Sequence, residues 1–277
     1  MNGVERTYHS MEPNVNPLRY NLVNIGRTSS GPAIGHEDGL TVSVGTRSRE
    51  GSVMRVCVFD VNETLLNMRA LDPLFEEAFG EPGVREQWFG QMIQSALVAT
   101  VTGAYRDFGT VGGAALDMTA ARRSLTLPTN VRREILETMR HLPPHPEVRD
   151  ALTNLRAAGF RLATLTNSTL GVVAAQLESS GLTPFFERVL SADTVSRLKP
   201  AAEPYHMAAR ELHVPIGEIR LIAAHAWDVA GALRAGAAAA FVSRPGVVLD
   251  PLAPTPDIVG ADLMVVAARI IDLEGRA

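Results

Sequence analysis

The chain has 277 residues, of which 20% are charged, and its formal net charge is −4. This length suits one α/β domain that carries a smaller second one, and the charge balance lacks the basic excess of nucleic-acid-binding proteins. A single cysteine excludes an internal disulfide framework, and the sequence shows neither a membrane-spanning apolar run nor a secretory signal. We therefore expect a soluble, cytoplasmic protein that binds neither nucleic acid nor membrane.

Residues 1–52 differ in composition from the rest of the chain. They scatter Asn, Gly, Ser, Pro and Arg without the sustained apolar periodicity of a helix or a strand. Such a segment cannot bury enough apolar surface to offset the entropy of ordering it, so we expect a disordered extension. Met54, just before the first expected strand, is a candidate for the true start of the protein.

The segment 55–66 is a short apolar run that ends in one carboxylate and a polar turn. Its β-branched and aromatic residues predict a strand buried on both faces, as in a parallel sheet. Asp60 falls at the carboxyl end of that strand, which is the edge where open α/β sheets bind ligands. Asp60 is therefore a candidate nucleophile, with capping of the following turn as the alternative role.

Apolar residues recur at helical spacing through most of the segment 71–141, which predicts four helices. The proline cluster at 143–146 then ends the helical region, because prolines cannot continue a helix. Helices inserted between two strands indicate a cap over the site. The expected division is a core made of 53–69 and 142–277 and a cap at 70–141.

Four further strands are expected to alternate with helices along the rest of the chain. Polar residues follow three of them: Thr166 and Asn167 end the first, Lys199 lies in the loop after the second, and Asp228 lies in the turn after the third. The alternation predicts a doubly wound parallel sheet of the Rossmann-like α/β class. The four strands are expected at 160–168, 188–191, 219–225 and 240–243.

Asp60, Lys199 and Asp228 together suggest chemistry that none of them suggests alone. A carboxylate nucleophile needs a cation beside it to stay ionised, and Lys199 is a candidate for that cation. Asp228 is a candidate for positioning the water that hydrolyses an ester formed on Asp60. A solvated loop lysine and a helix-capping aspartate are the structural alternatives. The occurrence of all three, in order after successive strands, favours function.

The chain carries four sequence blocks in order: FDVNETL at 59–65, LTNS at 165–168, Lys199-Pro200 with Tyr205, and AAHAWD at 223–228. Together they resemble the haloacid dehalogenase superfamily, and more narrowly its type II L-2-haloacid dehalogenases, from about residue 54 to the end. The resemblance implies a Rossmann-like core with a helical cap and no cofactor. It also implies that Asp60 attacks C2 of a 2-halo acid, displaces halide with inversion, and forms an ester that water cleaves.

The resemblance assigns roles to further residues. Thr64 and Lys199 would hold the nucleophile, and Asp228 would help to activate water. Thr166 and Asn167 would bind the carboxylate of the substrate, a small 2-halo carboxylate, and the family also implies a homodimer. The residues implied in substrate binding are Val61, Thr166, Asn167, Tyr205, His225 and Trp227.

Two features separate this sequence from the phosphatases of the superfamily. Phosphatases usually carry a second Asp two residues after the nucleophile as a general acid, and here that residue is Asn62, whose amide cannot donate and recover a proton. Phosphatases also tend to place paired acidic residues after the fourth strand to hold Mg²⁺, a cation that prefers oxygen ligands, whereas Asp228 has no second acid beside it. We therefore expect a metal-independent site.

Three positions depart from the type II enzymes themselves. Those enzymes commonly have a cap arginine that meets the departing halide, and the best-aligned residue here is Phe89, with Arg85 and Arg106 as candidate substitutes. Ala223 and His225 stand where the family often shows Ser and Asn. A neutral imidazole can orient water or accept a proton, and a histidine bonded only to backbone is the alternative.

We favour a hydrolytic dehalogenase of small (S)-2-haloacids. One alternative is a related hydrolase on the same fold, either a phosphatase or an enzyme that opens a strained ring beside a carboxylate. Mg²⁺ dependence would distinguish the phosphatase. The other alternative is a non-catalytic protein that keeps the fold for binding, against which the joint presence of Asp60, Lys199 and Asp228 argues.

Overall fold

The computed structural model describes residues 56–275, so the expected disordered extension at 1–52 and the candidate start at Met54 lie outside the described residues. The strands are β1 (Val56–Phe59), β2 (Leu162–Thr166), β3 (Arg188–Ser191), β4 (Ile219–Ala223), β5 (Ala238–Val242) and β6 (Ile258–Gly260). The α-helices are α1 (Asp72–Phe79), α2 (Val84–Val101), α3 (Phe108–Ala121), α4 (Thr129–Thr138), α5 (Val148–Ala157), α6 (Leu170–Ser179), α7 (Ala202–Leu212), α8 (Ala226–Arg234) and α9 (Leu263–Glu274).

These strands form one parallel sheet in the order β3-β2-β1-β4-β5-β6. β1 is central and wholly buried, as its apolar run predicts. The chain moves outward from β1 through β2 to β3 and then returns to β4, which makes a topological switch point beside β1. Phe59 is in register with Thr164 on one side and Ile222 on the other, so the residues that follow β1, β2 and β4 meet at one edge. The doubly wound parallel sheet is confirmed.

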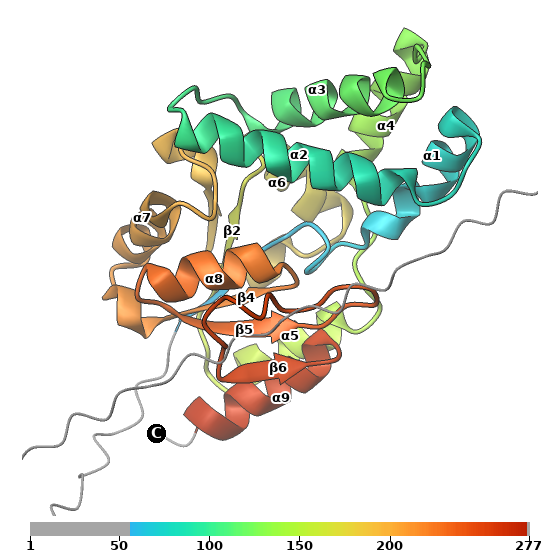
Figure 1. Cartoon of the computed structure of the whole chain (residues 1–277). Helices are drawn as coiled ribbons and strands as arrows, with labels where there is room; N and C mark the ends of the chain where they lie inside the picture. The colour runs from blue at the N-terminus through green and yellow to red at the C-terminus, as the bar shows by residue number, and fades with distance from the viewer. Residues whose placement is uncertain (1–55, 276–277) are drawn as a thin grey trace, which may run out of the picture. The chain divides into compact units, whose positions relative to one another are not determined.

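Helices cover both faces of the sheet (Figure 1). α5 and α9 share one buried apolar cluster with Cys57 and Phe59, whereas α7 and α8 share another with Val56 and Val58. This division follows from the pleat of β1, whose successive side chains point to opposite faces. Cys57 is 0% exposed, in agreement with its position inside an apolar run.

The structure extends beyond the predicted elements at the carboxyl-terminal end. β6 has three residues and pairs with β5, and α9 begins where the Asp262 carboxylate accepts a 2.8 Å hydrogen bond from the Val265 amide. A three-residue strand is too short to show a sequence period. The fourth strand ends at Ala223, because His225 already lies at the N-cap position of α8.

Helices α1 to α4 come between β1 and β2 and lie together beside the sheet (Figure 1). They pack around an aromatic group, in which the Phe75 and Trp88 ring centroids are 5.1 Å apart and the Trp88 indole donates to the Gly112 carbonyl at 2.9 Å. This group is continuous with the apolar cluster that contains Phe59. This inserted group matches the expected cap. We propose that the chain divides into a core at 53–69 and 142–277 and a cap at 70–141.

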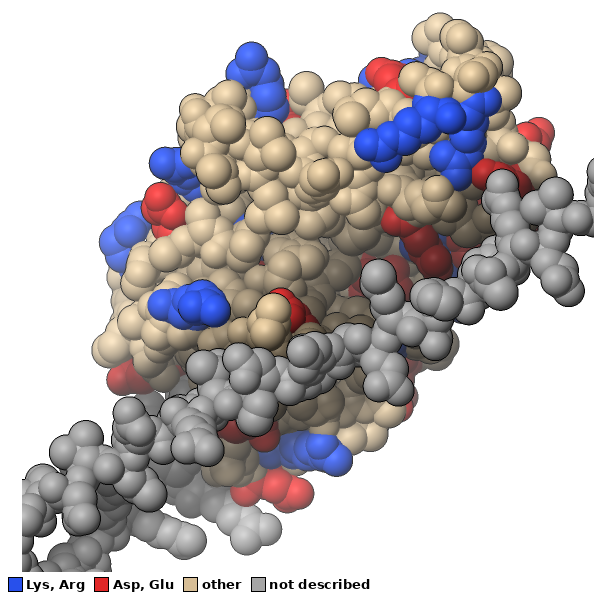
Figure 2. Space-filling view, in the orientation of Figure 1, with Lys and Arg blue, Asp and Glu red and all other residues tan. Residues whose placement is uncertain are grey.

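Charged side chains are dispersed over the face shown in Figure 2. Arginines lie there in separate small groups with acidic side chains among them, and much of the face is uncharged. Within residues 56–275, none of the helices is both long and apolar enough to span a bilayer.

Candidate active site

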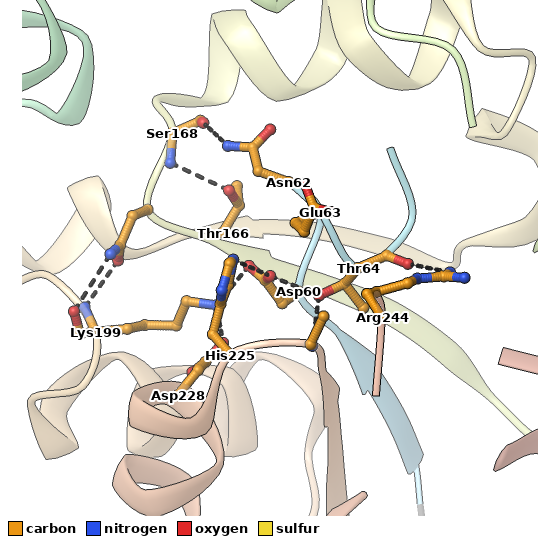
Figure 3. Close-up of polar contacts among 12 residues, drawn as sticks. Asp60, Asn62, Glu63, Thr64, Thr166, Ser168, Lys199, His225, Asp228 and Arg244 are labelled. Carbon is orange, nitrogen blue, oxygen red and sulfur yellow. Dashed lines mark hydrogen bonds and ion pairs between the residues drawn. The ribbon is translucent and has the colours of Figure 1, made fainter. Parts of the chain in front are cut away.

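Six of the predicted site residues gather near the ends of β1, β2 and β4 (Figure 3): Asp60, Thr64, Thr166, Lys199, His225 and Asp228. Asp60 directly follows β1, and its backbone amide donates to the Ile222 carbonyl of β4 at 3.0 Å. Thr166 is the last residue of β2, and His225 opens α8 directly after β4. Parallel pairing therefore brings side chains together that are more than 100 positions apart in the sequence.

Lys199 lies between two carboxylates. Its ammonium donates to Asp60 Oδ1 at 3.0 Å, to Asp228 Oδ2 at 2.6 Å and to the Leu165 carbonyl at 2.7 Å, and its side chain is 0% exposed. Burial alone would lower the pKa of Lys199, but the charges of Asp228 and Asp60 outweigh it and raise the pKa. Lys199 therefore stays charged in the interior, and each of its three ammonium protons is donated to one of these acceptors.

Asp60 is held as an ionised carboxylate. Its Oδ1 accepts from Lys199, and its Oδ2 accepts from the Thr64 hydroxyl at 2.7 Å and lies 3.7 Å from Nε2 of His225. Burial would raise the pKa of Asp60, but Lys199, His225 and the hydrogen bonds from Thr64 and Lys199 together lower it. The Thr64 oxygen also accepts from the Ala224 amide at 2.9 Å, which directs its proton to Asp60.

Asp228 is enclosed behind Lys199. Its Oδ2 accepts from Lys199, its Oδ1 accepts from the Tyr205 hydroxyl at 2.6 Å, and the residue is 0% exposed. Burial raises the pKa of Asp228, and the charge of Asp60 adds to that effect against the opposing charge of Lys199. Tyr205 is 1% exposed and lies on α7 beside α8. Asp228 and Tyr205 thus position Lys199 and do not face the pocket.

Aromatic rings close the other side of Asp60. The His225 ring is stacked between Phe89 and Trp227, with centroid distances of 5.3 and 5.1 Å. These three rings, together with Phe108 from the start of α3, line a small reaction pocket that also contains Asp60, Asn62, Thr166 and Asn167. The Asp60 carboxylate therefore faces a tight space that has aromatic rings on one side and polar side chains on the other.

The polar residues after β2 have two tasks. Asn167 clamps the backbone of Lys199: its Oδ1 accepts from the Lys199 amide at 2.8 Å, and its Nδ2 donates to the Lys199 carbonyl at 3.3 Å. The Thr166 hydroxyl oxygen accepts from the Ser168 amide at 3.2 Å and lines the reaction pocket. Val61, in contrast, is 0% exposed, and its carbonyl closes the turn by accepting from Leu65 at 2.9 Å.

A model of the haloacid dehalogenase-like hydrolases matches residues 54–236, which is more than half of the chain. The chain belongs to this hydrolase family. The match contains every residue of the four sequence blocks, and it also contains the helices inserted after β1.

Several characterised proteins resemble this haloacid dehalogenase-like hydrolase over most of their length. The (S)-2-haloacid dehalogenase H-109 of Pseudomonas putida is 26% identical over 201 residues, covering 72% of this chain and 90% of that protein. The haloacetate dehalogenase H-2 of Moraxella sp. (strain B) is 27% identical with the same coverage of both chains. A solved L-2-haloacid dehalogenase, RSc1362, superposes with a TM-score of 0.74 at 27% identity, covering 78% of this chain and 98% of the other.

Sequence reasoning missed part of the site of this hydrolase. Gln176 of α6, 0% exposed, donates to Asn62 Oδ1 at 2.9 Å and to the Met139 carbonyl at 2.7 Å, and Asn62 donates to Ser168 at 3.4 Å. Arg244 donates to the Thr64 carbonyl at 2.8 Å. A lone Gln in a helix carries no signal of burial. The nearest signal for Arg244 was its place just after the fifth strand.

The cap arginines named as halide candidates do not line the reaction pocket. Arg85 pairs with Asp72 at 2.5 Å and lines a separate hollow beside Phe89 and His225. Arg106 donates to the Tyr105 carbonyl at 2.8 Å and is exposed. The described cap residues therefore present rings, and not an arginine, to the space around Asp60.

Close packing of α8 holds Tyr205 in place, and this can be tested at Gly231. A Cβ added at Gly231 would lie 2.6 Å from the Tyr205 hydroxyl and 2.8 Å from the Pro200 carbonyl, so one of them must move. Gly231→Ala is expected to lower the free energy of unfolding by about 1–3 kcal/mol, as overpacking does. Urea unfolding measures the loss.

Gly171→Ala is the matched control for Gly231→Ala. Gly171 is exposed on α6, and an added Cβ there would have no neighbour within 4 Å. This control is expected to leave stability unchanged or raise it by up to about 1 kcal/mol, because alanine has the higher helix propensity. Equal unfolding midpoints for the two variants would contradict the packing argument.

Proposed function

We propose that this hydrolase cleaves the carbon–halogen bond of small (S)-2-haloacids through an ester on Asp60, giving a 2-hydroxy acid and halide. The observation that carries the proposal is the state of Asp60. It is a buried, ionised carboxylate, fixed by Lys199 and Thr64, and it opens into a pocket of aromatic rings. A desolvated carboxylate in a low-dielectric pocket is a strong nucleophile towards carbon. The dehalogenase names of the relatives support the same reaction.

In the first step, an oxygen of Asp60 forms a bond to C2 from the side opposite the halogen, and the halide leaves with the electron pair of the broken bond. Backside attack inverts the configuration at C2. The Thr166 hydroxyl and the Asn167 amide, both at the wall of the pocket, would receive the carboxylate of the substrate. The halide would leave against the rings of Phe89 and Trp227, whose edges carry partial positive charge.

In the second step, water attacks the carboxyl carbon of the Asp60 ester, and the alkyl C–O bond stays intact. The 2-hydroxy acid leaves with the oxygen that Asp60 used as nucleophile, and the water oxygen joins Asp60. We assign one proton of that water to His225, whose Nε2 lies 3.7 Å from Asp60 Oδ2 in the pocket wall. His225 then returns this proton to the departing oxygen of the 2-hydroxy acid, and Asp60 becomes a carboxylate again as its remaining proton passes to solvent. Asp228 acts through Lys199, because both its oxygens are bonded and buried.

The geometry around Asn62 disfavours the phosphatase alternative. Its amide is engaged at both ends, by Gln176 at 2.9 Å and Ser168 at 3.4 Å, so it is held as a structural amide where a phosphatase would have an acid.

We extend the proposal to the setting of the enzyme. It would act in the cytoplasm on a small carboxylate alone, without cofactor, metal, membrane or nucleic acid, and as a homodimer. Static light scattering of the purified protein would test the dimer, since a monomer mass would contradict it.

The function is tested by halide release from each enantiomer of 2-chloropropionate, with an aryl phosphate as the second substrate and with Mg²⁺ or chelator added to each. We expect chloride release from the (S) enantiomer at equal rates under both conditions. Phosphate release that requires Mg²⁺, without any chloride release, would replace the dehalogenase by a phosphatase. Release of neither chloride nor phosphate would contradict the proposed substrate class.

A further inference from the structure

The reaction pocket is too small for the alkyl chain of a long acid. Its free volume is about 10 Å³, whereas two larger cavities of about 350 and 250 Å³ lie beside it. Phe108 lines both the reaction pocket and the first cavity, while Phe89 and His225 line both the pocket and the second. A substrate with a longer alkyl chain must therefore reach into one of these two cavities.

The larger of them, here called the tail cavity, lies between α2, α3, α4 and α6. Its walls are mainly apolar. Its charged side chains, Arg132, Arg133, Glu137 and Arg140, all lie on α4 or just after it, where Arg132 pairs with Asp117 at 2.9 Å and Arg140 pairs with Glu137 at 3.4 Å. Such walls suit an alkyl chain. The apolar side chains are Trp88, Met92, Phe108, Leu136, Met139 and Val172.

The smaller cavity is a poor place for an alkyl chain. It has as many charged side chains as the tail cavity but fewer apolar ones. The charged residues are Glu63, Arg69, Arg85 and Glu86, and the apolar ones are Phe89, Pro245 and Val247. An alkyl chain there would displace water from charged groups without offering them a hydrogen bond, which costs free energy. The tail cavity is therefore the one that suits an extended substrate.

We propose that Phe108 sets the chain length of the 2-halo acid, because its ring separates the reaction pocket from the tail cavity. This inference rests on the proposed dehalogenase function. Phe108 is 4% exposed and begins α3, where the Asp107 carboxylate accepts from the Thr110 amide at 2.9 Å and fixes the start of the helix. With the ring in place the enzyme takes short acids. Without it, the two spaces join.

Phe108→Ala is expected to raise kcat/KM for 2-chlorohexanoate, relative to 2-chloropropionate, by about 10-fold or more. The extra methylene groups of the longer acid then move from water into the tail cavity, and each buried methylene raises kcat/KM about fourfold. Met92→Ala is the matched control, because Met92 is 3% exposed and lines the tail cavity but not the reaction pocket. Met92→Ala enlarges the tail cavity but keeps the Phe108 ring between the two spaces. The ratio of kcat/KM for the two acids should therefore stay at the wild-type value.

Phe108→Leu serves as a second variant in case alanine prevents folding, which circular dichroism and thermal melting would show; it should raise the ratio by a smaller factor. An unchanged ratio in a folded Phe108 variant, or an equal rise in Met92→Ala, would overturn the proposal.

If the wild type releases no halide from either acid, the proposed function fails and the partition is tested by binding. Hexanoate should then raise the Tm of Phe108→Ala more than that of the wild type, and equal shifts would overturn the partition.

Discussion

Asp60→Asn is expected to reduce halide release by on the order of 10⁴-fold or more, because an amide cannot form the ester on which turnover depends. The side chain is isosteric, and both hydrogen bonds at its oxygens come from fixed donors, Lys199 and Thr64. Steady-state chloride release over hours measures the residual rate.

Asp262→Asn is the control for Asp60→Asn. Asp262 caps α9 by accepting from the Val265 amide at 2.8 Å, and asparagine is an equally good N-cap residue. The control should therefore keep wild-type activity and stability. Full activity of Asp60→Asn, with its fold intact by circular dichroism, would refute the aspartyl-ester mechanism.

Lys199→Met is expected to lower kcat by about 10³-fold or more and the free energy of unfolding by about 3–5 kcal/mol, since it leaves two buried carboxylates without their shared cation. Asp60 and Asp228 then face each other with only hydroxyl donors, from Thr64 and Tyr205. Chloride release measures the first loss, and urea unfolding measures the second.

The same variant has a pH signature. In the wild type, Lys199 opposes the effect of burial and helps to keep the pKa of Asp60 low, so Asp60 is ionised at neutral and mildly acidic pH. Without Lys199, burial and the charge of Asp228 raise the pKa of Asp60, and the acid limb of kcat/KM should move to higher pH. Tyr205→Phe keeps all three charges and should leave the limb in place. An unmoved acid limb in Lys199→Met would contradict this role for the lysine.

The sequence predicts the parts of the site that depend on strand ends. Asp60 and Thr166 follow from the rule that parallel strands present their carboxyl ends at one edge, and Lys199 and Asp228 follow from the loops after the next strands. The resemblance added Tyr205, which no periodicity would have placed behind Asp228. The positions of these residues could be predicted because each depends on local pattern and chain order, and their roles in the reaction stay predictions.

Other features depend on contacts that leave no local signal. The bond between Gln176 and Asn62 joins residues 114 positions apart, and the Phe89–His225 stack joins the cap to the core. Phe108 has the sequence signature of any core phenylalanine, and only the two cavities reveal it as a partition. Such features are set by how the cap docks on the sheet, which the helical periods of its segments do not determine.

The most direct test of the ester on Asp60 is a single turnover in H₂¹⁸O with enzyme in excess over (S)-2-chloropropionate, followed by mass spectrometry of the product and of the peptide that contains Asp60. If Asp60 forms an ester that water cleaves at its carboxyl carbon, one ¹⁸O enters Asp60 and the 2-hydroxy acid carries ¹⁶O. If ¹⁸O appears in the 2-hydroxy acid and Asp60 stays unlabelled, water attacks C2 directly, and Asp60 is not the nucleophile.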